Sequence, residues 1–273
     1  MKFYLLASGS KGNCFLLQDE HLNVLVDCGS TKKYLLSAFE RIGFSLKDLD
    51  AVLITHTHTD HISQIKTFKD YPVYSPVEID KIDTIRVESE VPFQLQHVTV
   101  RPLALSHDAE KTTGYIFETW LEKLVYITDT GYVKDKYLPL LTGADYIILE
   151  SNHDIEKLMC TSRPYYVKQR IASDSGHLCN EDAANILDKI VTEKTKMIVL
   201  AHISEEANTR EKALEVTCNT LMKHRGSLNK DLNKDLIVCS AGQFEIEHGG
   251  DNSEKNILGT CYRTIGMEYY SNR

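Results

Sequence analysis

Three histidines and an aspartate lie within six residues of one another in the run H-x-H-x-D-H: His56, His58, Asp60 and His61. The run follows the apolar segment Ala51–Ile54, which predicts a buried strand. Residues two apart in an extended chain point to the same side, so His56 and His58 can bind one metal ion together. The chain must then turn, which lets Asp60 and His61 face a second position. This density of imidazole and carboxylate groups predicts a transition-metal site rather than a histidine-rich surface loop.

Three further candidate ligands each follow an apolar, β-rich run. A site for two metal ions needs more ligands than the H-x-H-x-D-H run supplies. They are His107 after residues 98–106, Asp129 after residues 124–128, and His202 after residues 197–201. Loops at the ends of strands are where a rigid sheet carries its chemistry. A single loop histidine would be unremarkable, but three such residues after an H-x-H-x-D-H run predict one shared metal centre.

The order H-x-H-x-D-H, His, Asp, His resembles the metallo-β-lactamase superfamily. Further segments resemble its YycJ-like (WalJ, VicX) branch, small bacterial metallohydrolases related to ribonuclease Z and ribonuclease J: residues 6–14, 26–29, 149–154, 176–178 and 200–204. The likeness runs from residue 1 to about residue 245. One departure is Cys179, where the branch leads us to expect a small hydroxyl residue, so hydrogen bonding near that position is in question.

The resemblance implies an α/β fold, the four-layer αβ/βα sandwich, and two divalent metal ions. His56, His58 and His107 would bind the first metal, Asp60, His61 and His202 the second, and Asp129 would bridge both. A hydroxide between the metals would be the nucleophile. Nitrogen and oxygen donors without a thiolate fit zinc best, with manganese or iron as alternatives. Asp60 and His177 are the candidate catalytic residues, and His177 would protonate the leaving oxygen or bind a phosphate oxygen.

Residues 151–175 are expected to form a lid over the site. Within them, three cations and two aromatic residues lie in eight positions: Arg163, Tyr165, Tyr166, Lys168 and Arg170. Such a mixture suits the backbone phosphate and the stacked base of a nucleic acid. It equally suits an amphipathic helix with a solvated basic face, and the sequence leaves both interpretations open.

The composition limits the classes of partner. The net charge of −8 argues against nonspecific coating of nucleic acid or anionic membrane, although local cations and metals would still permit a nuclease. The seven cysteines are odd in number and form no C-x-x-C pair, which favours reduced thiols in a cytoplasmic protein. The absence of any stretch long enough for a membrane span predicts no membrane partner.

Periodicity predicts a single domain over residues 1–273. We expect a helix over 31–42, a meander of short strands over 71–106, a strand pair at 114–120 and 123–128, a helix near 135–142 and another that begins at a capping Asn180. Other strands are expected at 3–7, 14–18, 22–27, 51–55, 145–149, 197–201, 235–239 and 243–247, with a helix at 209–225. Residues 248–273 lack periodicity and are expected to be a loosely packed tail.

The leading functional hypothesis is a metal-dependent phosphodiesterase that acts on nucleic acid. The resemblance implies a 5′-to-3′ exonuclease with DNA rather than RNA as partner, because the chain has neither the inserted domain of ribonuclease J nor an evident ribonuclease Z arm. One alternative is a small-molecule metallohydrolase for a cyclic phosphodiester, thioester or lactone, which the acidic charge favours. Another is a non-catalytic regulatory protein with structural metals, against which the complete ligand set argues.

Overall fold

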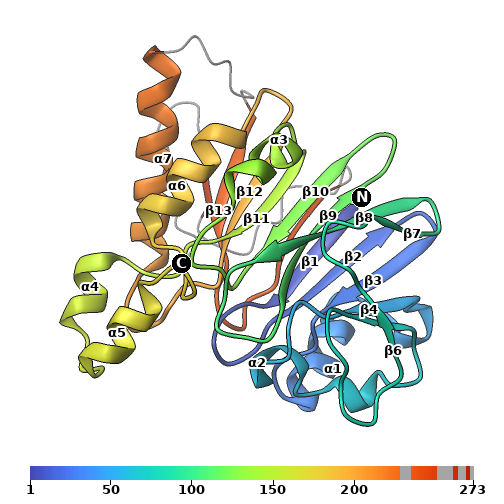
Figure 1. Ribbon diagram of the computed structural model, residues 1–273. Coiled ribbons are helices and arrows are strands. Elements are labelled where there is room, and N and C mark those ends of the chain that lie inside the picture. Colours follow the sequence, from blue (N-terminus) through green and yellow to red (C-terminus); the bar gives the residue numbers. More distant parts are fainter. Residues whose placement is uncertain (228–234, 251–260, 264–268, 271–273) are drawn as a thin grey trace.

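Two β-sheets pack face to face at the centre of the protein, and helices cover their outer faces (Figure 1). The computed structural model describes residues 1–227, 235–250, 261–263 and 269–270. The first sheet has the order β14-β1-β2-β3-β4-β5-β6 and the second has the order β16-β15-β13-β12-β11-β10-β9-β8-β7. This arrangement confirms the expected four-layer αβ/βα sandwich.

The strands of the first sheet are β1 (Lys2–Ala7), β2 (Cys14–Asp19), β3 (Leu22–Val26), β4 (Ala51–Leu53), β5 (Val73–Ser75), β6 (Thr84–Arg86) and β14 (Glu247–Gly250). Those of the second are β7 (Phe93–Leu95), β8 (Val98–Leu105), β9 (Thr112–Glu118), β10 (Lys123–Ile127), β11 (Tyr146–Glu150), β12 (Met197–Ala201), β13 (Ile237–Ser240), β15 (Cys261–Arg263) and β16 (Tyr269–Tyr270). The helices are α1 (Lys32–Arg41), α2 (Thr59–Ile62), α3 (Leu138–Leu141), α4 (Ile155–Cys160), α5 (Tyr165–Ile171), α6 (Asn180–Ile190) and α7 (Arg210–Ser227), with short 3-10 turns at Leu46–Asp48, Ile65–Thr67 and Asp135–Tyr137.

Alternation along the strands divides the apolar side chains among three layers of core. In β10, Leu124 and Tyr126 point into the core between the two sheets, whereas Val125 and Ile127 pack on the side of α3 and α6. Successive side chains of a strand point to opposite faces, so a strand covered on both faces must be apolar at every position. The continuous apolar runs of the sequence are therefore the expected signature of a sheet buried on both faces.

The helices of the outer layers bury one stripe each. α1 begins at the N-cap Thr31, whose side chain accepts a hydrogen bond from the backbone N–H of Tyr34, and it buries Leu35, Ala38 and Phe39. α6 buries Ala183, Ala184, Leu187 and Ile190. The prediction that Asn180 caps α6 is wrong. The preceding Cys179 is the N-cap, and its sulfur accepts the hydrogen bond from Asp182 N.

Two sequence predictions about strands need correction. Residues 71–106 do not form one meander, because β5 and β6 extend the first sheet in parallel while β7 and β8 pair antiparallel in the second. Short apolar runs show that a segment is buried but not which sheet receives it. The last strand of the first sheet is β14 at Glu247–Gly250 rather than 243–247, because Gln243 lies in a loop whose carbonyl accepts from Ser8 N.

The predicted tail at 248–273 lies mostly outside the described residues. Its described parts pair as strands: β14 with β1, β15 with β13, and β16 with β15. Over the described part of the chain, none of the helices combines the length and the apolar character that crossing a bilayer requires.

Candidate metal centre

The predicted ligands lie where the ends of several strands meet. β10, β11 and β12 run parallel, with Ile127 beside Leu149 and Leu149 beside Leu200. Their carboxyl ends are therefore level, which brings Asp129, Glu150 and His202 to one edge of the second sheet. β4 of the first sheet ends nearby and delivers the H-x-H-x-D-H segment, whose last residues form the first turn of α2.

Three residues at strand ends around the ligands, one from the first sheet and two from the second, have left-handed backbone conformations: Asp27 with φ of 59°, Asp129 with φ of 57° and His202 with φ of 54°. Aspartate and histidine tolerate this region better than most residues, yet it remains uncommon outside functional sites. Each of the three stands just past the end of a strand, where the left-handed turn breaks the strand's alternation. Tertiary hydrogen bonds hold two of them: Asp27 N donates to Leu53 O at 2.8 Å and His202 N donates to Ser8 Oγ at 2.8 Å.

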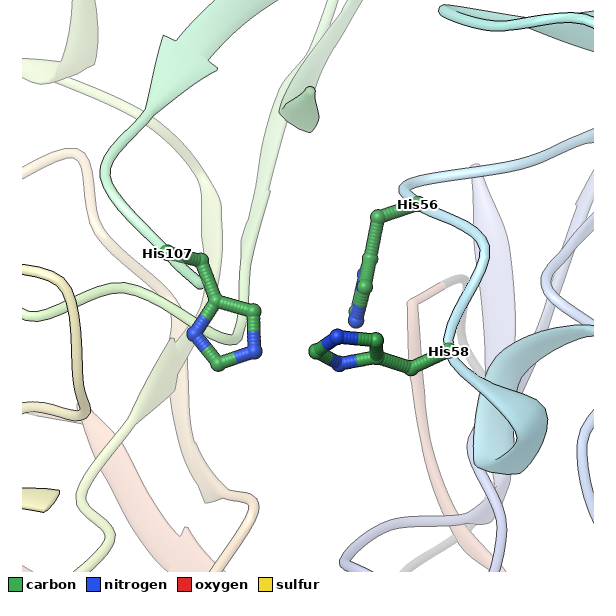
Figure 2. A group of neighbouring side chains, drawn as sticks. All are labelled: His56, His58 and His107. Atoms are coloured by element: carbon green, nitrogen blue, oxygen red, sulfur yellow. The ribbon is translucent and has the colours of Figure 1, made fainter. Parts of the chain in front are cut away.

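His56, His58 and His107 form the first group of potential ligands. Figure 2 shows the three imidazoles converging, with His107 on the loop after β8 and the other two on the loop after β4. Their ring centroids are separated by 4.6 Å for His56–His58 and by 5.1 Å from each of these to His107. One nitrogen of each ring lies within 4.8 Å of the others, as a shared cation requires. His107 Nδ1 donates to Gly176 O at 3.1 Å, which leaves Nε2 as the nitrogen that can bind a metal, with Asp108 Oδ1 3.2 Å from it.

The second group contains Asp60, His61 and His202, whose candidate ligand atoms also lie within 4.8 Å of one another. Asp129 stands between the two groups. Its Oδ2 is 3.2 Å from His61 Nε2, and its Oδ1 is 3.4 Å from His202 Nε2 and 3.9 Å from His107 Nε2. The structure thus brings all seven predicted ligands together, with Asp129 in the position of a bridge.

Three buried atoms at the centre have no hydrogen-bond partner among the described residues: His56 Nε2, His202 Nε2 and Asp129 Oδ2. Buried polar atoms are almost always paired, so unpaired imidazole nitrogens that face a carboxylate fit a site for cations. The residues present therefore fit two divalent metal ions.

A further layer of polar groups orients these ligands. Asp27 Oδ2 accepts a hydrogen bond from His61 Nδ1 at 2.7 Å, and Thr55 donates to the same carboxylate through its backbone N–H at 2.9 Å and its hydroxyl at 2.8 Å. Asn13 Nδ2 lies 3.3 Å from Asp60 Oδ2 and 2.9 Å from His61 Nε2. A cation bound at His61 Nε2 would replace this last contact.

Glu150 plays the same orienting part for two histidines. Its Oε1 accepts from His177 Nδ1 at 2.7 Å and from His202 Nδ1 at 2.8 Å, while its Oε2 accepts from Thr130 N at 2.9 Å. Sequence reasoning assigned no role to Asp27, Glu150 or Asn13. The signal for the two acids was present, because each stands at or just past the end of an apolar strand, as Asp129 does.

The electrostatics of the site lower the pKa of the Asp129 and Glu150 carboxyls and raise the pKa of two histidines, His61 and His202. Burial by itself would raise the pKa of Glu150, but His177 and His202 outweigh it and lower that pKa to about 2. Burial would lower the pKa of His202, but Asp129 and Glu150 raise it to about 9. Burial lowers the pKa of His56 far below its usual range, so His56 is a neutral imidazole ready to donate a lone pair. Binding of a metal at His202 must therefore release a proton.

A cavity of about 140 Å³ opens beside these groups, and His177, Asp60 and Arg170 are among its lining residues. The remaining predicted substrate residues lie away from it on or next to α5. Arg163 Nε pairs with Glu206 at 2.6 Å and Lys168 Nζ donates to Met159 O at 2.6 Å, while Tyr165 and Tyr166 are 68% and 73% exposed. α4 and α5 project together from one end of the molecule, at the lower left of Figure 1.

A family model described as a β-lactamase superfamily domain matches residues 22–203, which include the seven candidate ligands. The chain belongs to the metallo-β-lactamase superfamily. It is 34% identical over 240 residues to the exodeoxyribonuclease YycJ of Bacillus anthracis, covering 83% of this chain and 90% of that protein. It is also 34% identical over 236 residues to the exodeoxyribonuclease WalJ of Streptococcus pneumoniae, covering 81% of this chain and 88% of that protein. The expected membership and the expected metallohydrolase enzyme class are thereby confirmed.

Solved structures of this superfamily share the fold. The metallo-β-lactamase fold protein YhfI of Bacillus subtilis aligns with a TM-score of 0.67 and 18% identity over 91% of this chain and 99% of that chain. The short form of human tRNase Z aligns with a TM-score of 0.59 and 17% identity over 90% of this chain and 98% of that chain.

Proposed function

We propose that the protein is a nuclease that holds two divalent metal ions, zinc in preference to manganese or iron, and removes nucleotides from the 5′ end of DNA. The observation that carries the proposal is the position of Asp129, whose Oδ2 lies 3.2 Å from His61 Nε2 in the second group and whose Oδ1 lies 3.9 Å from His107 Nε2 in the first. A carboxylate shared between two groups of imidazoles is what a binuclear centre needs. The two exodeoxyribonucleases at 34% identity, of which the chain covers 90% and 88%, support DNA as the substrate.

Two metal ions in such a centre would lower the pKa of a shared water toward neutrality and stabilise the charge that develops on a phosphate. The chain's own residues would then orient the metal ligands and protonate the leaving oxygen. Asp27 and Glu150 keep His61 and His202 in the tautomer that exposes Nε2. His177 is held by Glu150 through Nδ1, which leaves Nε2 as the nitrogen that can give a proton to the leaving oxygen.

The lining of the cavity indicates how a nucleic acid would bind. Asp129, Arg170 and His177 are among its lining residues, and none of the described Phe, Tyr or Trp side chains is. Polar groups of this kind bind a phosphate, whereas a base needs an aromatic ring to stack on. The bases of a bound strand would therefore contact Tyr165 and Tyr166, whose exposed rings lie outside the cavity.

The net charge of −8 favours a second candidate, hydrolysis of a small molecule such as a cyclic phosphodiester, a thioester or a lactone, without any contact to Tyr165 and Tyr166. A panel of single-stranded DNA, bis-nitrophenyl phosphate, a cyclic phosphodiester, a thioester and a lactone separates the two. Turnover of the thioester or lactone without any phosphodiester activity would overturn the nuclease proposal. Metal binding without turnover of any substrate would favour the regulatory alternative.

The main test pairs metal analysis with end-labelled nucleic acids. We expect close to two metal ions per chain, and fewer at both positions after Asp129→Ala. On DNA, a 5′ label should appear at once in the shortest product, whereas a 3′-labelled strand should shorten progressively. RNA of the same sequence should be cut more slowly. Release of the 3′ label first, or internal cuts in circular DNA, would contradict the proposed polarity.

A further inference from the structure

Asp108 is an acidic residue at the mouth of the cavity that the proposed reaction leaves without a role. Its Oδ1 lies 3.2 Å from His107 Nε2 and 3.9 Å from His58 Nε2. Its Oδ2 accepts from Arg170 Nη1 at 2.6 Å. Asp108 and Arg170 both line the cavity, and both are partly exposed. One carboxylate thus spans the distance between the first histidine group and a guanidinium at the end of α5.

An anion in this position makes the contacts that a substrate phosphate would make. Arginine recognises carboxylates and phosphates through similar pairs of oxygens. A phosphodiester carries the same single negative charge as the Asp108 carboxylate, so its advantage would come from the metals as well as from Arg170. The imidazole nitrogens on the other side belong to the proposed first metal, which would attract the same oxygens. We propose that Asp108 is a positioning residue that stands in for the substrate phosphate: it holds Arg170 over the cavity until a phosphate displaces it.

The ion pair is suited to displacement because it is partly exposed. Pairs of this kind contribute little stability in water, so a phosphate that gains both the arginine and the metals can replace the carboxylate. A neutral thioester or lactone offers no charge to Arg170 and leaves the pair closed. Asp108 would thus favour anionic substrates. This inference rests on the proposed phosphodiester substrate and adds a selection step to it.

The other predicted substrate cations do not share this arrangement. Arg163 is paired with Glu206, and Lys168 donates to a backbone carbonyl at the end of α4, and neither lines the cavity. Arg170 is therefore the cation of this set that can reach the reacting phosphate, and Asp108 is the residue that holds it there.

The test is the affinity of metal-loaded protein for inorganic phosphate, measured by calorimetry so that no turnover is needed. Asp108→Asn frees Arg170 and removes a competing charge, so phosphate should bind roughly two- to tenfold tighter. Arg170→Gln should weaken phosphate binding. In the Arg170→Gln background, Asp108→Asn should change phosphate affinity less than it does in the native protein. Asp108→Glu should restore near-original affinity. With bis-nitrophenyl phosphate, Asp108→Asn should lower KM more than it changes kcat.

A matched control is Glu118→Gln, which neutralises the carboxylate of the Arg101–Glu118 pair at the far end of β8 and β9. It should leave phosphate affinity unchanged. If Asp108→Asn lowers the metal content, Asp108 is a metal ligand and the inference is wrong. Unchanged or weaker phosphate binding with full metal content also overturns it. A nuclease assay that fails while the phosphate effect stands would reject only the proposed function.

Discussion

Asp27 and His61 are 34 positions apart, yet Asp27 Oδ2 lies 2.7 Å from His61 Nδ1 and both side chains are fully buried. The contact joins the end of β3 to the first turn of α2. It fixes the proton on Nδ1 and directs Nε2 toward Asp129. A histidine held in this way already has its ring oriented for a metal at Nε2.

Asp27→Asn should therefore weaken metal binding at the second position. An amide can still accept a hydrogen bond but loses the charge that strengthens it, and loss of such orienting partners typically costs about 10–100-fold in metal affinity. Competition with a chelator, followed by metal analysis, measures the effect. Asp19→Asn is the control, because Asp19 also contacts a histidine, His97, at 2.7 Å on the surface. Equal metal affinity in the Asp27 variant and the native protein would contradict the assignment.

His177→Ala should lower kcat on DNA by roughly 10²–10⁴-fold while the metal content stays intact. The reason is the proposed proton transfer to the leaving oxygen. Nitrophenolate is a good leaving group and needs less protonation, so bis-nitrophenyl phosphate should lose less activity. An equal loss on both substrates would point to phosphate binding by His177 instead.

Tyr165→Ala combined with Tyr166→Ala should weaken binding of a single-stranded oligonucleotide. Stacking contributes about 1–3 kcal/mol per base, whereas Tyr165 and Tyr166 are not among the residues that line the cavity where a small phosphodiester would bind. The control is Trp120→Ala, which removes a ring that is 88% exposed at the turn between β9 and β10. Fluorescence anisotropy with a labelled oligonucleotide measures the affinity of the double tyrosine variant and of the Trp120 variant. If both variants bind equally well, Tyr165 and Tyr166 are only solvated surface residues.

Cys179→Ser should stabilise the protein by roughly 0.5–1 kcal/mol. The Cys179 sulfur caps α6 by accepting from Asp182 N at 3.4 Å, and a hydroxyl is the better acceptor. Burial raises the pKa of the Cys179 thiol to about 12, so no thiolate charge assists the cap. Urea unfolding of the metal-free protein gives the comparison, with Cys179→Ala expected to be less stable than the serine variant. A serine variant less stable than the native protein would contradict this prediction.

Glu247 should make stability fall as pH rises. Burial raises the pKa of Glu247 to about 8; the Arg210 charge offsets this only partly, and the negative charge of Glu245 adds to the rise. Between the ordinary carboxyl pKa and pH 8, the folded protein keeps a proton that the unfolded chain has released. Stability is therefore lost progressively over this range, and the loss is complete above pH 8.

Glu247→Gln removes this penalty. It should raise the free energy of unfolding at pH 9 by roughly 1–3 kcal/mol, less than the whole shift because glutamine gives up charge next to Arg210, and it should change little at pH 5. Urea unfolding of metal-free protein at both pH values measures the difference. An effect of the same size at pH 5 and pH 9 would rule out titration of Glu247 as its cause.

The local chemistry of this protein could be predicted from the order of its residues. His56 and His58 share one side of an extended segment, and His107, Asp129 and His202 follow apolar runs, because alternation and strand ends are properties of neighbouring residues. The fold class followed from the resemblance that these residues carry. The thiol cap of α6 could not be predicted in this way, since the N-cap position depends on the backbone angles of Cys179.

The tertiary structure alone decided which groups face one another. Periodicity reports that a segment is buried but not against what, so β5 and β6 could not be assigned to one sheet and β7 and β8 to the other. The contacts of Asp27 with His61, of Glu150 with His177, and of Asp108 with Arg170 join separate loops. They form only because the packed sheets bring the ends of their strands together, and hydrogen bonds across such distances leave no periodic trace in the sequence.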